Sequence, residues 1–391
     1  MATNNENRVK RNSLNMLDLG ELTDDELVGI THFSVQSRKV VPPEGGPIPD
    51  NQPLSQRIGL CTNMTELVVV NCARLPPEIS YCAMLSELRL FSHGNDGNDC
   101  RIELPEGTVL QNLTQVTVQG GGNWNTDEII SWLATFSPNL RNLHFHDVTK
   151  DTANQFLRSL QDNEAFLDQF KNKLEIVAFI NCNFNEDDAR SILFDMKPLY
   201  HRLDVIDLRN NNIEGLETIG TAVRETPPAN NVQLLPSNLR GLYLKGNAFV
   251  RNLNDPDSPD SVAMICLLKY HPLLYKIEDR NDITITSYSS LIHYWLMING
   301  SELRYMLDDG HGGTRLSVLP YAMHHVYKKR KQDPTTMFII LREGPIFRTN
   351  YQNNVDYGNV HDDDDGDDND NRICCFMVPF TSLFLRRGPT E

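Results

Sequence analysis

LDVIDLRNN, residues 203–211, and LRGLYLKGN, residues 239–247, carry the same spacing of apolar residues. In each stretch an aliphatic residue is followed by a second one three positions later, by a third two positions after that, and by Asn three positions further on. These positions are Leu203, Ile206, Leu208 and Asn211 in the first stretch, and Leu239, Leu242, Leu244 and Asn247 in the second. Because alternate residues of a strand point to opposite faces, each stretch predicts a short strand with one buried face.

The same spacing recurs in five earlier windows. With the two stretches above they make seven windows, and consecutive windows start 21 to 36 residues apart. Their apolar positions are Met64, Leu67 and Val69; Leu85, Leu88 and Leu90; Leu113, Val116 and Val118; Leu140, Leu143 and Phe145; and Leu174, Val177 and Phe179. The last position is held in turn by Cys72, His93, Gly121, Val148 and Cys182. A degenerate further window runs from Leu274 to Ile277. Units of this length cannot bury their apolar faces alone, so the pattern predicts a stack of repeats.

The spacing resembles the leucine-rich-repeat signature, and residues 55–285 resemble the ribonuclease-inhibitor-like subgroup of that superfamily. The resemblance implies an α/β solenoid, curved like a horseshoe, with a parallel β-sheet on the concave side and helices on the convex side. It also implies a binding surface instead of a catalytic pocket. Helices that return the chain to the next strand are predicted after Asn125, after Asn185 and over residues 217–225. The shortest spacing between windows, 21 residues from Met64 to Leu85, leaves room only for an extended return.

Four segments follow from these patterns. Residues 1–54 are predicted to be a disordered N-terminus with a short capping helix and a Pro/Gly-rich linker, and residues 55–285 to hold seven or eight repeats. Residues 286–349 are predicted to form a helical C-terminal cap, in which LIHYWLMI, residues 291–298, is apolar almost all round and should be buried. Residues 350–391 are predicted to be an acidic, largely disordered tail.

The N-terminal helix has two interpretations. LDLGELTDDELVGITHF, residues 17–33, places Thr23 and Glu26 as a capping box and predicts a helix that covers the first repeat. Its LTDDELVGI stretch also resembles the opening of an F-box. The Pro and Gly residues of the following segment do not continue that resemblance, because an F-box needs further helices.

Composition and charge bear on compartment and partners. The chain of 391 residues has a net charge of −16, and seven of the negative charges lie in one run over Asp362–Asp370. This balance argues against nucleic-acid binding, which needs positive charge to capture phosphates. We expect no signal peptide, no membrane-spanning segment and no disulfide framework, and therefore a reduced cytoplasmic protein. The basic cluster Lys328–Lys331 resembles a nuclear-import signal, so a nuclear location stays open.

No stretch of the sequence carries the motif of an enzyme or of a cofactor site. His144 and His146 alternate with Phe145 and should share one face of a strand, but no third metal ligand with suitable spacing accompanies them. The Asp362–Asp370 run lacks the closing Glu of a calcium-binding loop. We therefore expect no catalytic residue, no cofactor and no metal. Cys72, Cys182, Asn211 and Asn247 hold the last position of their windows and are expected to be buried and bonded to backbone groups.

The partner-binding residues are expected on the concave face, where alternate strand residues point. An apolar centre with a charged rim is typical of protein interfaces, and Tyr, Arg and Phe tend to contribute most of the binding energy. The residues that we predict to contact a partner are Arg89, Phe91, His144, His146, Ile176, Ile180, Asp207, Arg209, Tyr243 and Lys245.

Three functions are compatible with the sequence. The first is a non-enzymatic, monomeric scaffold that binds a partner protein along the concave face. The second is a substrate receptor of a ubiquitin ligase, which the F-box-like LTDDELVGI favours. The third is a regulator of a small GTPase, by resemblance to the Ran GTPase-activating proteins, which also join such repeats to an acidic tail.

Overall fold

The structure is a computed structural model that describes residues 22–36, 56–70, 76–92, 99–100, 108–121, 123–195, 202–225, 238–271, 273–277 and 288–300, together with His324 and Lys328. All of these belong to one compact unit, Met1–Phe347. The expected linker, the acidic tail with its aspartate run, and most of the expected C-terminal cap lie outside the described residues.

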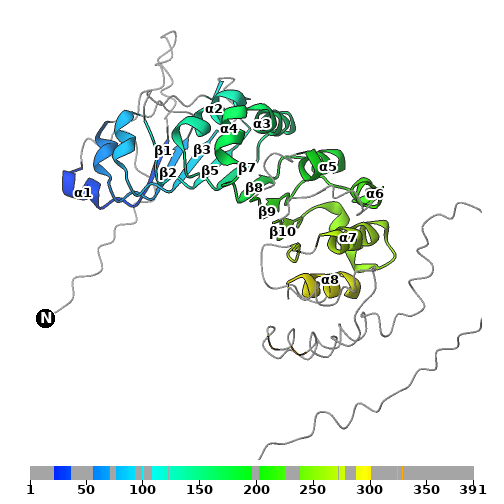
Figure 1. The fold of residues 1–391 in the computed structure, drawn as a ribbon. Helices are drawn as coiled ribbons and strands as arrows, with labels where there is room; N and C mark the ends of the chain where they lie inside the picture. The colour runs from blue at the N-terminus through cyan, green and yellow to red at the C-terminus, as the bar shows by residue number, and fades with distance from the viewer. Residues whose placement is uncertain are drawn as a thin grey trace, which may run out of the picture. The chain divides into compact units, whose positions relative to one another are not determined.

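One open sheet of eight parallel strands organises this unit (Figure 1). Neighbouring long strands in the sheet are also consecutive in the chain, as stacked repeats require. The strands are β1 His32–Gln36, β2 Glu66–Val70, β3 Glu87–Phe91, β5 Gln115–Gln119, β7 Asn142–His146, β8 Ile176–Ile180, β9 Val205–Asp207 and β10 Gly241–Tyr243. The seven full windows of the sequence coincide with the seven strands from β2 to β10 in this list, so the predicted strands are confirmed.

Helices return the chain along one side of the sheet (Figure 1). The α-helices are α1 Asp24–Val28, α2 Thr126–Phe136, α3 Lys150–Asp162, α4 Glu164–Phe170, α5 Glu186–Asp195, α6 Glu217–Glu225, α7 Pro259–Tyr270 and α8 Ser290–Gly300. The 3₁₀ helices are η2 Gln56–Leu60, η3 Pro77–Tyr81 and η6 Ala248–Asn254. The short strands β4 Asp99–Cys100 and β6 Asn123–Trp124 form a second sheet. Within the described part of the chain, no helix is both long and apolar enough to cross a bilayer.

Helix starts follow the predicted caps. The Asn125 side chain accepts from the Glu128 backbone N–H at the start of α2, and the Asn185 side chain accepts from the Asp188 N–H at the start of α5. At α1 the capping box of Thr23 and Glu26 is complete. These side chains satisfy backbone donors that a helix start leaves unpaired.

The core lies between the sheet and the helices. Inward strand residues such as Leu67, Leu88 and Val116 are fully buried. In the middle of the unit Phe145 on β7 stacks on Phe179 of β8, with ring centroids 4.9 Å apart. Burial of these alternate positions is the main source of stability that joins one repeat to the next.

The chain turns sharply after the five long strands β5, β7, β8, β9 and β10. Asp147, Asn181 and Asn210 adopt positive φ angles of 55°, 55° and 57°, and Gly120 and Gly246 do so at 97° and 86°. Gly, Asn and Asp tolerate this left-handed region best. In all five turns the next residue holds the last position of a window. Val148, Cys182, Asn211 and Asn247 are buried there, whereas Gly121 is exposed.

Two features of the fold differ from the sequence prediction, and a third, the expected degenerate window, is now described by its pairing. The helix expected over residues 17–33 is wrong beyond Val28, because residues 32–36 form β1 in register with β2. The shortest repeat returns through η3 and not through a wholly extended segment. The degenerate window at Leu274 adds an isolated parallel bridge between Gly241 and Lys276.

Candidate functional site

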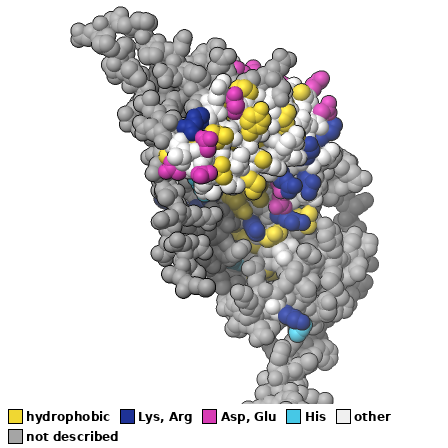
Figure 2. Space-filling model, turned by 90° about the vertical axis from the view of Figure 1, so that its left-hand side faces the viewer, with side chains coloured by type: hydrophobic (Ala, Val, Ile, Leu, Met, Phe, Trp, Pro, Cys, Tyr) yellow, Lys and Arg dark blue, Asp and Glu magenta, His cyan; other side chains and the backbone are white. Residues whose placement is uncertain are grey.

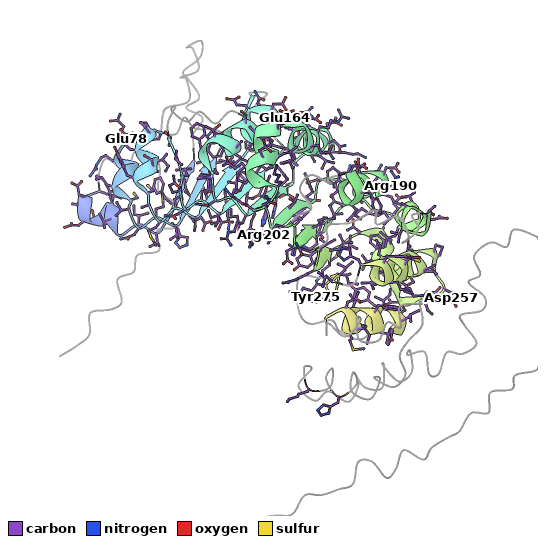
Figure 3. The ribbon with its side chains drawn as sticks, viewed as in Figure 1. Glu78, Glu164, Arg190, Arg202, Asp257 and Tyr275 are labelled. Carbon is purple, nitrogen blue, oxygen red and sulfur yellow. The ribbon has the colours of Figure 1, made fainter. Side chains whose placement is uncertain are left out.

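Alternate strand residues share one face of the sheet, which we call the outward face. It comprises the first, third and fifth positions of the seven long strands that follow β1, counted two positions past the ends of the three-residue strands β9 and β10. The residues between them are buried in the core, and on the face itself Thr117, Ala178, Val205 and Asp207 are also buried. In-register pairing aligns these positions into rows. The middle row runs through Val68, Arg89, Thr117, His144, Ala178, Asp207 and Tyr243. Figure 3 shows Glu164, Arg190 and Asp257 on the helix side of the unit and Arg202 and Tyr275 on the other side.

The structure places the predicted contact residues on this face at different depths. Arg89 and Lys245 are exposed, whereas Asp207, which we expected to be exposed, is only 4% exposed. The remaining predicted residues are half-buried: Phe91, His144, His146, Ile176, Ile180, Arg209 and Tyr243. Arg209 and Lys245 lie two positions beyond the ends of β9 and β10.

A charged cluster occupies the N-terminal part of the face. Arg89 Nε lies 2.7 Å from Glu87 Oε1 and 3.0 Å from Glu66 Oε1. Gln115 Nε2 donates to the same Glu87 oxygen at 3.0 Å. The cluster therefore holds two carboxylates around one guanidinium, and it is acidic on balance.

A stacked histidine pair occupies the middle of the face. The rings of His144 and His146 are nearly parallel, with an interplanar angle of 9° and centroids 5.9 Å apart. Their Nε2 atoms are buried and have no hydrogen-bond partner. Burial and the neighbouring His146 lower the pKa of His144 to about 4, and burial also lowers the pKa of His146. Both rings are therefore neutral at pH 7. The described residues contain no group of three or more His, Cys, Asp or Glu that could hold a metal ion.

Arg209 closes over Asp207 on the C-terminal side of the histidines. Arg209 Nη2 donates to Asp207 Oδ2 at 2.6 Å, and Arg209 Nε donates to Asp207 Oδ1 at 2.9 Å. The guanidinium carbon lies 5.8 Å from the centre of the Tyr243 ring. This bidentate pair explains why Asp207 is buried, and it fixes the Arg209 side chain beside Tyr243.

A further line of residues borders the outward face, and sequence analysis did not identify it. We call it the edge row: the residues immediately before the eight long strands, namely Thr31, Thr65, Ser86, Thr114, Arg141, Glu175, Asp204 and Arg240. Each backbone N–H in the row after the first donates to the carbonyl of the preceding member, at 2.8 to 3.0 Å. The backbone ladder is thus the same along the whole row, whatever the side chain.

The side chains of the edge row change character halfway along the sheet. In the first half the hydroxyls follow the backbone: Thr65 Oγ1 donates to the Thr31 carbonyl at 3.0 Å, and the Ser86 and Thr114 hydroxyls repeat this contact at 3.2 Å. In the second half the side chains are charged. Figure 2 shows described Lys and Arg side chains gathered along one margin of the surface, with acidic side chains among them.

Comparison with known proteins identifies no relative of the chain. No protein-family model matches its sequence, and no curated protein matches it.

Proposed function

We propose that the chain is a leucine-rich-repeat solenoid of the ribonuclease-inhibitor-like type, curved like a horseshoe, with its helices on the convex side. The ladder position supports this proposal. Asn211 donates to the Phe179 and Leu208 carbonyls and accepts from the Cys182 and Phe184 N–H groups, so one amide joins neighbouring turns. This set of contacts gives a physical reason for Asn at the last position of the windows that begin at Leu203 and Leu239.

The proposal includes a helical cap over the last repeat. Ile292 and Leu296 of α8 are fully buried, as expected for a helix that covers an open core. Asn299 Nδ2 donates to the carbonyls of Leu268, His271 and Leu274 at 2.8 to 3.2 Å. These bonds tie α8 to the end of α7 and to the last rung of the sheet.

We further propose that the chain is a non-enzymatic, cytoplasmic scaffold that binds a partner protein through the outward face. The observation that carries this proposal is the composition of the face between β7 and β10. Half-buried Ile176 and Ile180 lie on β8, the neighbour of the strand that leads to the fixed Arg209–Tyr243 pair, and exposed Lys245 follows Tyr243. Apolar and aromatic side chains held in place, with charge at the margin, suit a protein partner.

The test is capture of partners from the native cell type by the full chain and by a Tyr243→Ala/Lys245→Glu variant. We leave Arg209 intact, because its removal would leave buried Asp207 without its partner. The proposal predicts a protein that the unmodified chain captures and the variant loses, identified by mass spectrometry.

The matched control is Tyr81→Ala/Arg190→Glu, which likewise removes one Tyr and reverses one positive charge, at exposed positions of η3 and α5. This control should capture the same protein as the unmodified chain. Identical partner lists for all three proteins would show that the outward face is not the binding surface.

The F-box alternative receives less support from the geometry of α1. Arg57 of η2 donates to the Leu22 carbonyl at 2.8 Å and to Asp24 Oδ1 at 2.9 Å, and Leu27 is fully buried. These contacts favour a helix that belongs to the first repeat. No contact among the described residues favours the GTPase-regulator alternative over the scaffold.

A further inference from the structure

The charged half of the edge row is the strongest unexplained feature of the unit. The backbone ladder needs no particular side chain there, because Thr and Ser fill the same position in the first half. Two further cations adjoin it: Arg202, two residues before Asp204, and Lys276, which pairs with Gly241 and donates its backbone N–H to the Arg240 carbonyl at 3.0 Å. The cluster comprises four cations and two acidic neighbours. The cations are Arg141, Arg202, Arg240 and Lys276, and the acidic neighbours are Glu175 and Asp204. It is positive by two charges in a chain whose net charge is −16.

The guanidiniums of this cluster are only loosely held. Arg141 Nη1 lies 3.4 Å and Arg202 Nη2 3.7 Å from Glu175 Oε1, and Arg240 Nε lies 3.5 Å from Asp204 Oδ1. The three side chains are 57%, 59% and 57% exposed. These are long, single-point contacts, unlike the bidentate Arg209–Asp207 pair on the same sheet. Since a guanidinium has five N–H donors, most donors of the three remain available to a ligand.

Apolar side chains lie immediately beside the cluster. Ile176 follows Glu175 at the start of β8 and is half-buried, whereas Val205, which follows Asp204 at the start of β9, is only 9% exposed. A ligand that crosses these strands therefore meets cations along one margin and the aliphatic Ile176 side chain along the other. Neighbouring strands lie about 4.8 Å apart, so the distance from Arg141 to Arg240, three strands away, is about 14 Å. An extended peptide of about five residues covers that distance.

We propose that this cluster binds an acidic segment of a partner protein in which carboxylates alternate with apolar residues. Bidentate geometry suits guanidinium to carboxylate, and the alternation lets one side of an extended segment meet the arginines while the other meets Ile176. The inference rests on the proposed function in taking the ligand to be a protein. Half-buried Ile176 beside the cations offers an apolar contact that a chain of phosphates does not use, which favours a peptide over a nucleic acid or a phospholipid surface.

The test uses fluorescence anisotropy with the full chain and a labelled synthetic peptide of about ten residues in which Asp alternates with Leu. We expect binding that weakens with added salt, because the Debye length falls from about 10 Å at 0.1 M to about 3 Å at 1 M. Arg202→Glu/Arg240→Glu should weaken binding at least about tenfold, since two attractive contacts become repulsive. Arg158→Glu/Arg190→Glu, the same change at exposed positions of α3 and α5, should leave binding within about twofold.

Several outcomes would overturn the inference: no binding of the peptide, equal binding of a peptide with Asn in place of Asp, or equal losses in the two variants. Tighter binding of a single-stranded RNA or of phosphatidylserine vesicles would also overturn it, because the surface would then recognise phosphate. Its failure is distinguishable from failure of the proposed function. If the peptide does not bind but Tyr243→Ala/Lys245→Glu still loses a captured partner, the proposed function holds and the inference fails. If the peptide binds as predicted but that variant loses no partner, the inference holds and the proposed binding surface fails.

Discussion

A single amide shows at the residue scale what the repeat requires. Asn211 Nδ2 donates to the Phe179 carbonyl at 2.7 Å and to the Leu208 carbonyl at 2.9 Å, while its Oδ1 accepts from two backbone N–H groups. Cys182 at the equivalent position makes long contacts from Sγ to the Phe145 and Ile180 carbonyls, at 3.5 and 3.4 Å, and a further one to the Val148 backbone. Burial raises the pKa of Cys182 to about 12, so this thiol stays protonated and acts as a donor.

The first prediction concerns this position. Asn211→Ala should lower the free energy of unfolding by about 3 kcal/mol or more, because it leaves several buried backbone groups unpaired. Asn212→Ala next to it is the control: Asn212 is exposed, and its change should stay within about 0.5 kcal/mol. Urea unfolding of both variants measures the difference. Similar losses for the two variants would mean that the Asn211 amide does not join the repeats.

The second prediction concerns the histidine pair. The folded pKa of His144 is depressed to about 4 from an ordinary 6.5, so the unfolded chain binds more protons between these values. Its neutral ring contributes stability above about pH 6.5, and that contribution is lost as the pH falls towards 4. Asp207 and Glu87 partly offset the shift, and Arg209 and His146 reinforce it.

Thermal unfolding at pH 7 and pH 5 tests this prediction. The drop in melting temperature between the two should be smaller in His144→Gln than in the unmodified chain. His324→Gln, at an exposed helical position, is the control and should keep the original drop. An unchanged drop in His144→Gln would contradict neutral burial of the ring.

At the scale of the element, the sequence predicted the strands better than their returns. Each of the seven windows has three apolar positions at fixed spacing, and that spacing follows directly from the alternation of a half-buried strand. β1 has the same spacing in Ile30, Phe33 and Val35, but Arg38 stands where Asn or Cys is expected and the Thr23 cap starts a helix just before it. The helix signal therefore obscured the strand.

The third prediction concerns the segment from α1 to β1. Leu27→Ala should cost about 3 kcal/mol, because Leu27 is fully buried in the same core as the repeats. Val28→Ala, at a residue that is 40% exposed, should cost less than about 1 kcal/mol. Chemical unfolding measures both. A Leu27→Ala protein as stable as the unmodified chain would show that α1 is an appendage and not part of the first repeat.

At the scale of the whole molecule, the outward face was predictable and the edge row was not. Alternation alone identifies which strand residues point outward. It cannot identify Asp207 as buried, because that depends on Arg209 folding back two positions later. The edge row lay outside the apolar spacing. Its signal was the residue after the first apolar position, which changes from Thr, Ser and Thr at 65, 86 and 114 to Arg, Glu, Asp and Arg at 141, 175, 204 and 240.

The measurement that tests the central claim most directly is hydrogen–deuterium exchange of the full chain with and without the captured partner. Binding through the outward face predicts slower exchange in peptides that contain β7 to β10 and the preceding edge-row residues, with α3 and α5 unchanged. Protection confined to the helices, or to residues 286–391, would contradict the claim that the partner binds along the sheet.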